Sequence, residues 1–266
     1  MSSAPMNPVL LFLLLCTAAV AASRLSPAQD LRPGIIGKDD RVLLQASGPP
    51  WDAIGQVNVA GFDRVDGCTG TLVAPNLVIT AGHCIMNPWK KIPYPLQEIH
   101  FIAGVRGDAI KGHAKALCLH FPKDYRYIPP DKVLPSMLAQ KVTIGSFATD
   151  IVAIVLDRKL AVAPAPLADG LTPRPDLPLI HVAYPVDHRF MPWAHLSCHL
   201  LGTDAEMPFW YNDCDTYPGS SGGPLFVEMN GTPRLAAIMV GGIPQKTNIA
   251  LPIATWPELT QNTKCP

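Results

Sequence analysis

Short runs of alternating apolar and polar residues, or of several apolar residues in a row, recur along most of the chain. Nearly all are four to seven residues long and are bounded by Gly, Pro, Asn or Asp, which is typical of β-strands joined by turns. They form two sets: residues 56–60, 71–74, 76–80, 98–104 and 151–156, then 179–184, 195–200, 224–228, 234–240 and 248–253. The pattern predicts an all-β protein, a sandwich or a barrel, built in two parts.

The organisation around these two sets follows from composition. The Pro-rich stretch 163–178 separates them and is predicted to link an N-terminal β unit, 51–162, to a C-terminal one, 179–266. Residues 23–50 are polar and interrupted by Pro and Gly, so they are predicted to form a pro-segment or an extended arm that contributes little core.

The apolar run at residues 9–22 is 14 residues long, too short to span a bilayer comfortably, and is followed by small residues that suit a cleavage site. We therefore expect residues 1–22 to be a removed export signal and the mature protein to be secreted or periplasmic, without a membrane contact. An uncleaved anchor is the alternative, because residues 1–8 contain no Lys or Arg.

Charge and cysteine content narrow the classes further. Lys and Arg number 21 and Asp and Glu 21, so the zero net charge offers no electrostatic footprint for nucleic acid. Loss of the signal would leave six cysteines, which in an exported chain predict three disulfides among fifteen possible pairings. No Cys-x-x-Cys pair exists, His195 and His199 are expected in a strand or loop, and we expect neither a metal nor a cofactor.

Two segments carry candidate chemistry, Thr80-Ala-Gly-His83-Cys84 and Gly219-Ser-Ser221-Gly-Gly-Pro224. A serine hydroxyl becomes a nucleophile when a neutral imidazole accepts its proton, and glycines allow backbone N–H groups to face a developing oxyanion. Alone, either segment would also suit a structural His at a strand end or a plain glycine-rich turn. Together they indicate acyl transfer.

Cys68-Thr-Gly-Thr-Leu-Val-Ala-Pro-Asn-Leu-Val-Ile-Thr-Ala-Gly-His83-Cys84, with Gly219-Ser-Ser221-Gly-Gly-Pro, resembles the trypsin-like, chymotrypsin-fold serine proteases. Residues 36–41 and 214–222 are more similar to the bacterial glutamyl-endopeptidase-like branch. The resemblance implies two six-stranded antiparallel β-barrels that pack together with the active site in the cleft between them.

The resemblance also implies a triad, with His83 as general base, Ser221 as nucleophile and Asp150 as the acid that orients the imidazole. Asp157, at the other end of the same apolar strand, is the rival acid. The family pattern places the nucleophile at Ser221, so Ser220 stands where digestive proteases have an Asp that receives a newly cut amino terminus. Ser cannot form that ion pair. The implied oxyanion donors are the backbone N–H groups of Gly219 and Ser221.

The family likeness implies a Cys68–Cys84 disulfide beside the His83 turn. Cys198 with Cys214 would brace the segment that leads to Ser221, and elimination leaves Cys118 with Cys265.

The same resemblance implies a set of substrate-binding residues. Asp215 is either a specificity-pocket carboxylate, as in the trypsin branch, or a structural hydrogen-bond acceptor. Thr216 matches a residue that helps glutamyl endopeptidases hold an acidic side chain, but their key His aligns with Met239, which cannot donate a hydrogen bond to a carboxylate. Val240 and Gly242 are expected to form the edge that pairs with an extended peptide.

We therefore expect a monomeric, secreted serine endopeptidase that acts on polypeptides through an acyl-enzyme, with no nucleic-acid partner. The alternative is a catalytically inactive binding protein of the same fold.

Overall fold

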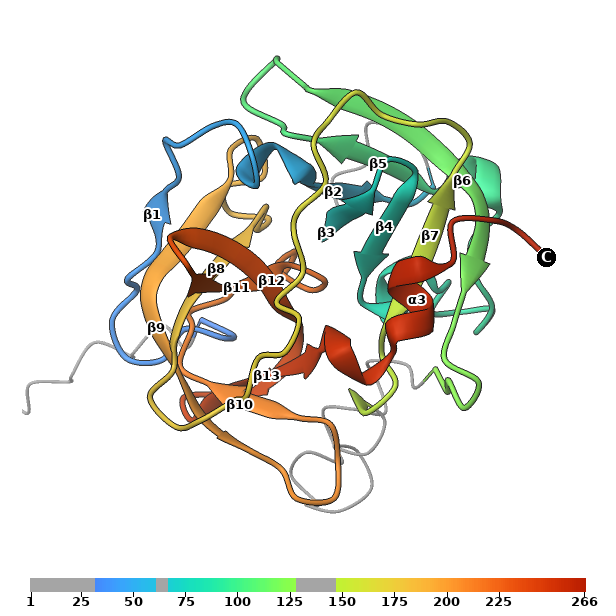
Figure 1. Cartoon of the computed structure of the whole chain (residues 1–266). Coiled ribbons are helices and arrows are strands. Elements are labelled where there is room, and N and C mark those ends of the chain that lie inside the picture. Colours follow the sequence, from blue (N-terminus) through green and yellow to red (C-terminus); the bar gives the residue numbers. More distant parts are fainter. Residues whose placement is uncertain (1–31, 61–66, 128–146) are drawn as a thin grey trace, which may run out of the picture. The chain divides into compact units, whose positions relative to one another are not determined.

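The first half of the described chain closes into a six-stranded antiparallel barrel. A computed structural model describes residues 32–60, 67–127 and 147–266. The barrel strands follow the order β2-β3-β4-β7-β6-β5 (Figure 1). Their bounds are β2 Ile54–Asn58, β3 Gly67–Ala74, β4 Leu77–Thr80, β5 His100–Ala103, β6 Gly112–His120 and β7 Val152–Leu156. All residues of β4 and β7 are buried, because these strands are continuous apolar runs rather than alternating ones.

The second half forms another ring of six strands. The order is β9-β10-β13-β12-β11-β8, and pairing of β8 with β9 closes the ring, while β1 adds to the edge of β9. The bounds are β1 Val42–Leu43, β8 Pro178–Ala183, β9 Trp193–Thr203, β10 Trp210–Asn212, β11 Pro224–Met229, β12 Thr232–Ile243 and β13 Thr247–Pro252. The predicted all-β fold of two six-stranded antiparallel barrels is confirmed.

Helical structure is sparse and short in the described residues. It comprises η1 Trp51–Ala53, η2 Gly82–Ile85, η3 Leu96–Glu98, η4 Ile253–Thr255 and α3 Pro257–Gln261. No helix in this part of the chain has the length and apolar character needed to cross a membrane. The proposed export signal, 1–22, lies outside the described residues.

All ten predicted apolar runs lie on strands, but the sequence pattern missed β1, β6 and β10. Strand β6 has the sequence GHAKALCLH. Its buried residues Ala114 and Ala116 are small, the exposed Lys115 lies between them, and the strand contains none of the β-branched residues that are typical of strands. Strand β10 has only three residues. Strands β6 and β10 form because neighbouring strands supply partners on both sides, and β1 forms by pairing with β9.

The segments outside the barrels are tied to both of them. The Pro-rich stretch runs between the rings, where Ala165 N–H donates to the Leu72 carbonyl and Ala168 N–H to that of Leu235. Residues 32–50 do contribute core, contrary to the sequence expectation, because Ile35 is 4% and Leu44 5% exposed. The domain limits inferred from the sequence stay proposals.

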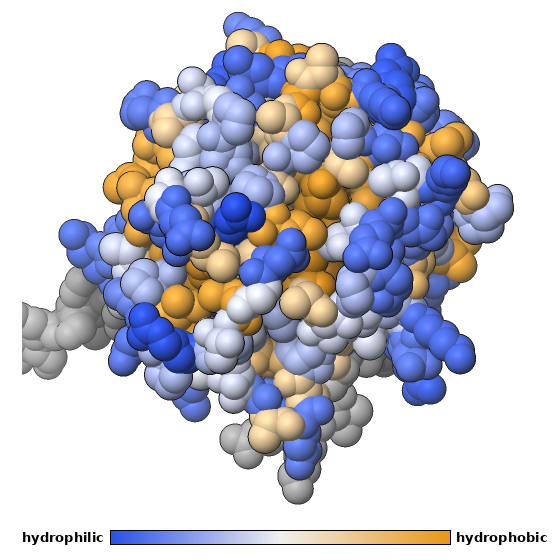
Figure 2. Space-filling model, in the orientation of Figure 1, coloured by the Kyte–Doolittle hydropathy of each residue, from blue (hydrophilic) through white to orange (hydrophobic). Residues whose placement is uncertain are grey.

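The exposed surface mixes polar and apolar side chains. Figure 2 shows hydrophobic residues lying between hydrophilic ones on one face. Scattered exposed apolar residues are normal for a folded chain and do not by themselves mark a binding site.

Candidate active site

His83 and Asp150 meet at one end of two paired strands. Strand β4 leads into η2, which carries His83, and Asp150 lies two residues before β7, whose Val152 pairs with Thr80 of β4. The His83 Nδ1 atom lies 2.5 Å from Asp150 Oδ2, and the His83 backbone N–H donates to Asp150 Oδ1 over 2.7 Å. Asp150 is buried, so both its oxygens face the histidine and not solvent.

The surroundings set the protonation of His83. Burial lowers the pKa of the imidazole by desolvation, but the negative charge and hydrogen bond of Asp150 outweigh this effect and leave the pKa raised. In the neutral ring the Nδ1–H donates to the carboxylate, so the lone pair is on Nε2. That tautomer is the one a general base needs.

The rival acid lies elsewhere. Asp157, just after β7, accepts a hydrogen bond from the Lys115 backbone N–H and pairs with Arg158 on the surface. The structure thus brings Asp150, and not Asp157, to His83.

The Ser221 loop packs against the first barrel beside His83. The Thr69 backbone N–H donates to the Ser221 carbonyl over 2.9 Å, and the Cys84 sulfur lies 3.8 Å from the same oxygen. Gly222 has a φ of +76°, and a Cβ there would lie 2.1 Å from Thr80 Oγ1 and 2.8 Å from Ala81 N. Only glycine allows this approach, which brings Ser221 to the strand that leads to His83.

The two adjacent serines have different environments. Ser220 is 2% exposed, and its Oγ accepts the Tyr217 N–H over 3.2 Å, so its hydroxyl serves the turn. Ser221 is half-buried and lines a pocket.

Two backbone N–H groups near Ser221 are oriented through the carbonyls of their own peptide units. In a trans peptide the C=O and N–H point in opposite directions. The Pro218 carbonyl accepts the Val186 N–H over 2.7 Å, which turns the Gly219 N–H the other way. The Ser220 carbonyl accepts the Gly223 N–H over 2.8 Å, and this turns the Ser221 N–H of the same peptide unit away from Gly223. Gly219, at φ +97°, has the backbone conformation that favours glycine.

A pocket of about 170 Å³ opens beside Ser221. Thr216 and Gly242 are among its lining residues, whereas Asp215 and Val240 are not. Its other walls come from Tyr217, Pro218, Ser220, Met239, Gly241, Pro244 and Asn248, and from Pro33 and Gly34 of the N-terminal arm. None of these lining side chains carries a charge.

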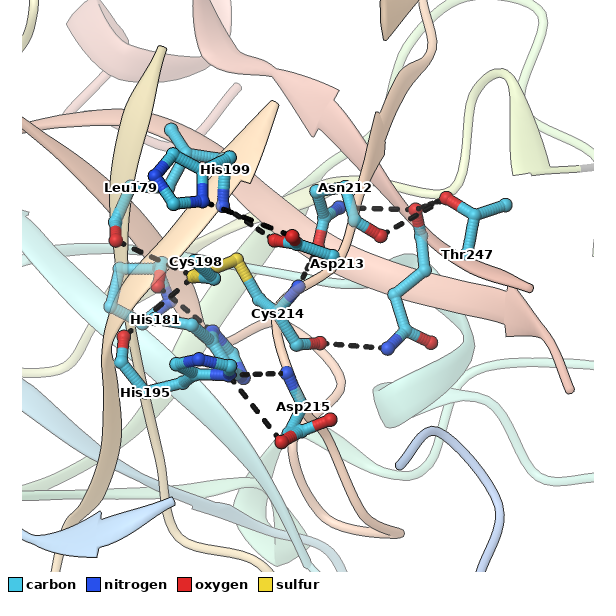
Figure 3. Close-up of a disulfide and its surroundings, with 12 residues drawn as sticks. Leu179, His181, His195, Cys198, His199, Asn212, Asp213, Cys214, Asp215 and Thr247 are labelled. Carbon is cyan, nitrogen blue, oxygen red and sulfur yellow. Dashed lines mark hydrogen bonds and ion pairs between the residues drawn. A yellow bond between two sulfur atoms is a disulfide. The ribbon is translucent and has the colours of Figure 1, made fainter. Parts of the chain in front are cut away.

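Asp215 instead binds the arm. Its buried carboxylate accepts the Ile36 N–H on Oδ1 and the Asp40 N–H on Oδ2, both over 2.8 Å. Desolvation by burial raises the pKa of this carboxyl. Figure 3 shows Asp215 beside His195, whose Nδ1 accepts the Asp215 backbone N–H. This geometry corresponds to the structural alternative raised from the sequence.

Pro33 and Gly34 of the N-terminal arm reach the pocket, which the sequence pattern did not predict. The Gly34 carbonyl accepts hydrogen bonds from Thr216 N–H and Asn248 Nδ2, and a Cβ on Gly34 would lie 2.1 Å from Thr216 Oγ1. Gly34 and Thr216 are 182 positions apart (216 − 34), so only the Pro-Gly pair at 33–34 could have signalled a turn there.

Tyr125 was also missed. Its ring covers Gly82, where a Cβ would lie 2.5 Å from Tyr125 Cε2. Burial first, and then the charge of Asp150, raise the pKa of the Tyr125 hydroxyl. Tyr125 therefore helps to enclose the segment that carries His83.

The three predicted disulfides, Cys68–Cys84, Cys118–Cys265 and Cys198–Cys214, are present. The third joins β9 to the segment before Asp215 (Figure 3). Of three clusters of possible metal ligands in the described residues, two contain these bonded cysteines. In the third, Asp40, His195 and Asp215, the Asp215 carboxylate and the His195 Nδ1 already accept protein hydrogen bonds.

Part of the chain matches a known protein family, and its fold matches two solved proteases. Residues 45–173 match the family model described as Trypsin. A Glu endopeptidase solved in complex with MPD superposes with a TM-score of 0.65 at 20% identity, covering 85% of this chain and 96% of that one. The VesB protease of Vibrio cholerae gives a TM-score of 0.59 at 15% identity, covering 85% of this chain and 66% of that one.

In sequence, the extracellular metalloprotease of Bacillus subtilis (strain 168) is 41% identical over 61 residues, which are 21% of this chain and 20% of that protein. The match thus spans about a fifth of that relative's length. The Trypsin match and the shared two-barrel fold confirm the resemblance of this chain to trypsin-like, chymotrypsin-fold serine proteases.

Proposed function

We propose that the protein is a secreted serine endopeptidase that hydrolyses peptide bonds with Ser221, His83 and Asp150. The observation that carries the proposal is the His83–Asp150 pair, with both carboxylate oxygens on the histidine, beside the Ser221 loop. The three disulfides support a chain that folds in an oxidising compartment.

In the first step, Ser221 Oγ would attack the scissile carbonyl carbon while His83 Nε2 takes the hydroxyl proton. The negative oxygen of the tetrahedral intermediate would accept the Gly219 and Ser221 N–H groups. His83 then gives the proton to the leaving amine, and the acyl-enzyme forms. Water, deprotonated by His83, releases the acid and restores Ser221. Asp150 holds the imidazole and stabilises the imidazolium throughout.

The pocket beside Ser221 favours an uncharged side chain before the scissile bond. Its lining offers hydroxyl and amide groups of Thr216, Tyr217 and Asn248 and the apolar Met239, but no charged group to pair with Glu, Lys or Arg. An unpaired charge in such a site is costly. A peptide library digested with the purified protein should therefore show cleavage after uncharged residues, and a strict preference for a charged one would contradict this assignment.

The deciding experiment is labelling with a fluorophosphonate followed by intact-mass spectrometry. We expect one adduct on the native chain and on Ser220→Ala, and none on Ser221→Ala. The Ser220→Ala variant is a matched control for the site of the adduct, because it removes the neighbouring hydroxyl and its hydrogen bond from the Tyr217 N–H but leaves Ser221 in place. Absence of an adduct on folded native protein would favour the inactive binding protein of the same fold.

A further inference from the structure

Arg41 is a buried cation that joins three separate segments of the chain. Its side chain is only 3% exposed. The guanidinium donates to Asp39 through Nε and Nη2, both over 2.9 Å, and to Asp187 through Nη2 over 2.7 Å and Nη1 over 3.3 Å. Its Cζ also lies 5.4 Å from the centre of the Tyr217 ring. A guanidinium in such a place is tolerated because two carboxylates pair with its fork.

The partners of Arg41 lie next to the proposed oxyanion hole. Asp187 follows Val186, whose N–H holds the Pro218 carbonyl and so turns the Gly219 N–H away from Val186. A Cβ on Gly219 would lie 2.9 Å from the Tyr184 carbonyl oxygen and 3.1 Å from the Val186 nitrogen, so the two backbones are in contact. Residues 184–186 therefore pack directly against the Gly219 peptide.

Tyr217 provides a second route. It directly precedes Pro218, and the Arg41 guanidinium lies against its ring. The same cation thus contacts both chain segments whose hydrogen bond orients the Gly219 peptide.

We propose that Arg41 is a positioning residue for the oxyanion hole and holds the Gly219 N–H in place through Asp187 and Tyr217. This inference rests on the proposed protease function. It also fits the serine at position 220, which cannot receive a new amino terminus as the Asp of digestive proteases does. Here a guanidinium already present in the uncut chain provides the buried positive charge near the nucleophile loop.

The test compares Arg41→Met with Arg41→Lys, Asp187→Asn and the control Arg158→Met. Arg158 follows β7 of the first barrel, pairs with Asp157 at the surface, and has a side chain that is 61% exposed. We expect Arg41→Met to lower kcat about 10²-fold, as loss of one oxyanion donor does, with KM changed less than about 3-fold. Arg41→Lys should restore part of kcat, because Lys keeps the charge but not the fork.

A second readout separates the hole from general damage. Inhibition by a peptidyl trifluoromethyl ketone depends on the oxyanion of its hemiketal, so its Ki should rise in parallel with the loss of kcat while the melting temperature of Arg41→Lys stays near that of the native protein. Normal kcat and Ki in a folded Arg41→Met or Asp187→Asn variant would overturn the proposal. So would equal losses in Arg158→Met.

Amide hydrogen exchange tests the coupling without catalysis. Peptides covering residues 184–187 and 217–221 should exchange faster in Arg41→Lys and Asp187→Asn than in Arg158→Met. If the native chain forms no fluorophosphonate adduct, the proposed function fails, but this exchange result still decides whether Arg41 orders the loop. Unchanged exchange in both segments would overturn the inference even in an active enzyme.

Discussion

The two barrels supply the proposed site in different ways. The first barrel brings two side chains together, His83 and Asp150, by placing them at one end of paired strands. The second barrel supplies a loop in which the Gly219 and Ser221 N–H groups take their direction from hydrogen bonds on neighbouring carbonyls. The contribution of the first barrel depends on side-chain identity and protonation. Apart from the Ser221 hydroxyl itself, the contribution of the second barrel depends on backbone conformation.

This difference shows which perturbations should act on each half. A change of pH should act through the first barrel, because an imidazole titrates near neutrality. A change of backbone conformation should act through the second barrel. A peptide N–H does not titrate, but it can donate to the oxyanion in only one backbone conformation. Mutations in one barrel should therefore leave the contribution of the other barrel to catalysis unchanged.

The largest effect should come from Asp150→Asn. The amide would leave the shape in place but favour the wrong tautomer of His83, and we expect kcat to fall about 10⁴-fold, as in other triads. Steady-state kinetics of Asp150→Asn beside Asp157→Asn measures this. Asp157→Asn should retain activity within about 3-fold. A greater loss in Asp157→Asn would reassign the acid.

The next largest effect should come from Gly219→Ala. At φ +97° a Cβ is strained, and it would also lie 2.9 Å from the Tyr184 carbonyl oxygen, so the peptide must turn. We expect kcat to fall about 10² to 10³-fold with little change in KM, because the substrate pocket is intact. Gly202→Ala is the control, since no atom lies within 4 Å of a Cβ built there. Equal kinetics in the two variants would show that catalysis does not depend on the backbone conformation of Gly219.

The pH dependence should report the first barrel alone. The Asp150 charge raises the pKa of His83 against the effect of burial, so His83 becomes protonated, and inactive as a base, at a pH above its ordinary value of 6.5. The acid limb of kcat/KM should therefore lie above pH 6.5 in the native enzyme. It should move to lower pH in Asp150→Asn and stay unmoved in Gly219→Ala. A limb that moves in Gly219→Ala would show that the two halves are coupled.

The same division explains what the sequence could predict. His83, Ser221 and the ten apolar runs are local signals, because strand alternation and glycine-rich turns span only a few residues. The partner of His83, Asp150, was predictable from the family resemblance, in which an Asp precedes an apolar strand; the run alone left Asp157 as a rival. Barrel closure followed from the family resemblance and not from the alternation itself.

The long-range contacts around the loop were not predictable. Arg41 and Asp187 are 146 residues apart, and Asp215 accepts an N–H from Ile36 at a separation of 179. The Lys-Asp-Asp-Arg sequence at residues 38–41 does not distinguish a buried ion pair from a solvated charged turn. Burial depends on segments that are distant in the sequence and pack against it. The sequence therefore predicts little core in the arm, although Pro33 and Gly34 of the arm line the pocket.

The smallest effect on catalysis should come from Asp215→Asn, which separates its two proposed roles. Both carboxylate oxygens accept backbone N–H groups of the arm, so the amide keeps one acceptor and turns an NH2 group toward the other N–H. We expect the free energy of unfolding to fall by about 1 to 3 kcal/mol, measured by urea titration, while kcat/KM on uncharged substrates falls less than about 10-fold. Asp213→Asn is the matched control, because the Asp213 carboxylate accepts the His199 N–H of β9 and not the Ile36 and Asp40 N–H groups of the arm. Selective loss of cleavage after Arg or Lys in Asp215→Asn, with stability unchanged, would instead make Asp215 a pocket carboxylate. Its hydrogen bonds to the arm would then contribute nothing to stability.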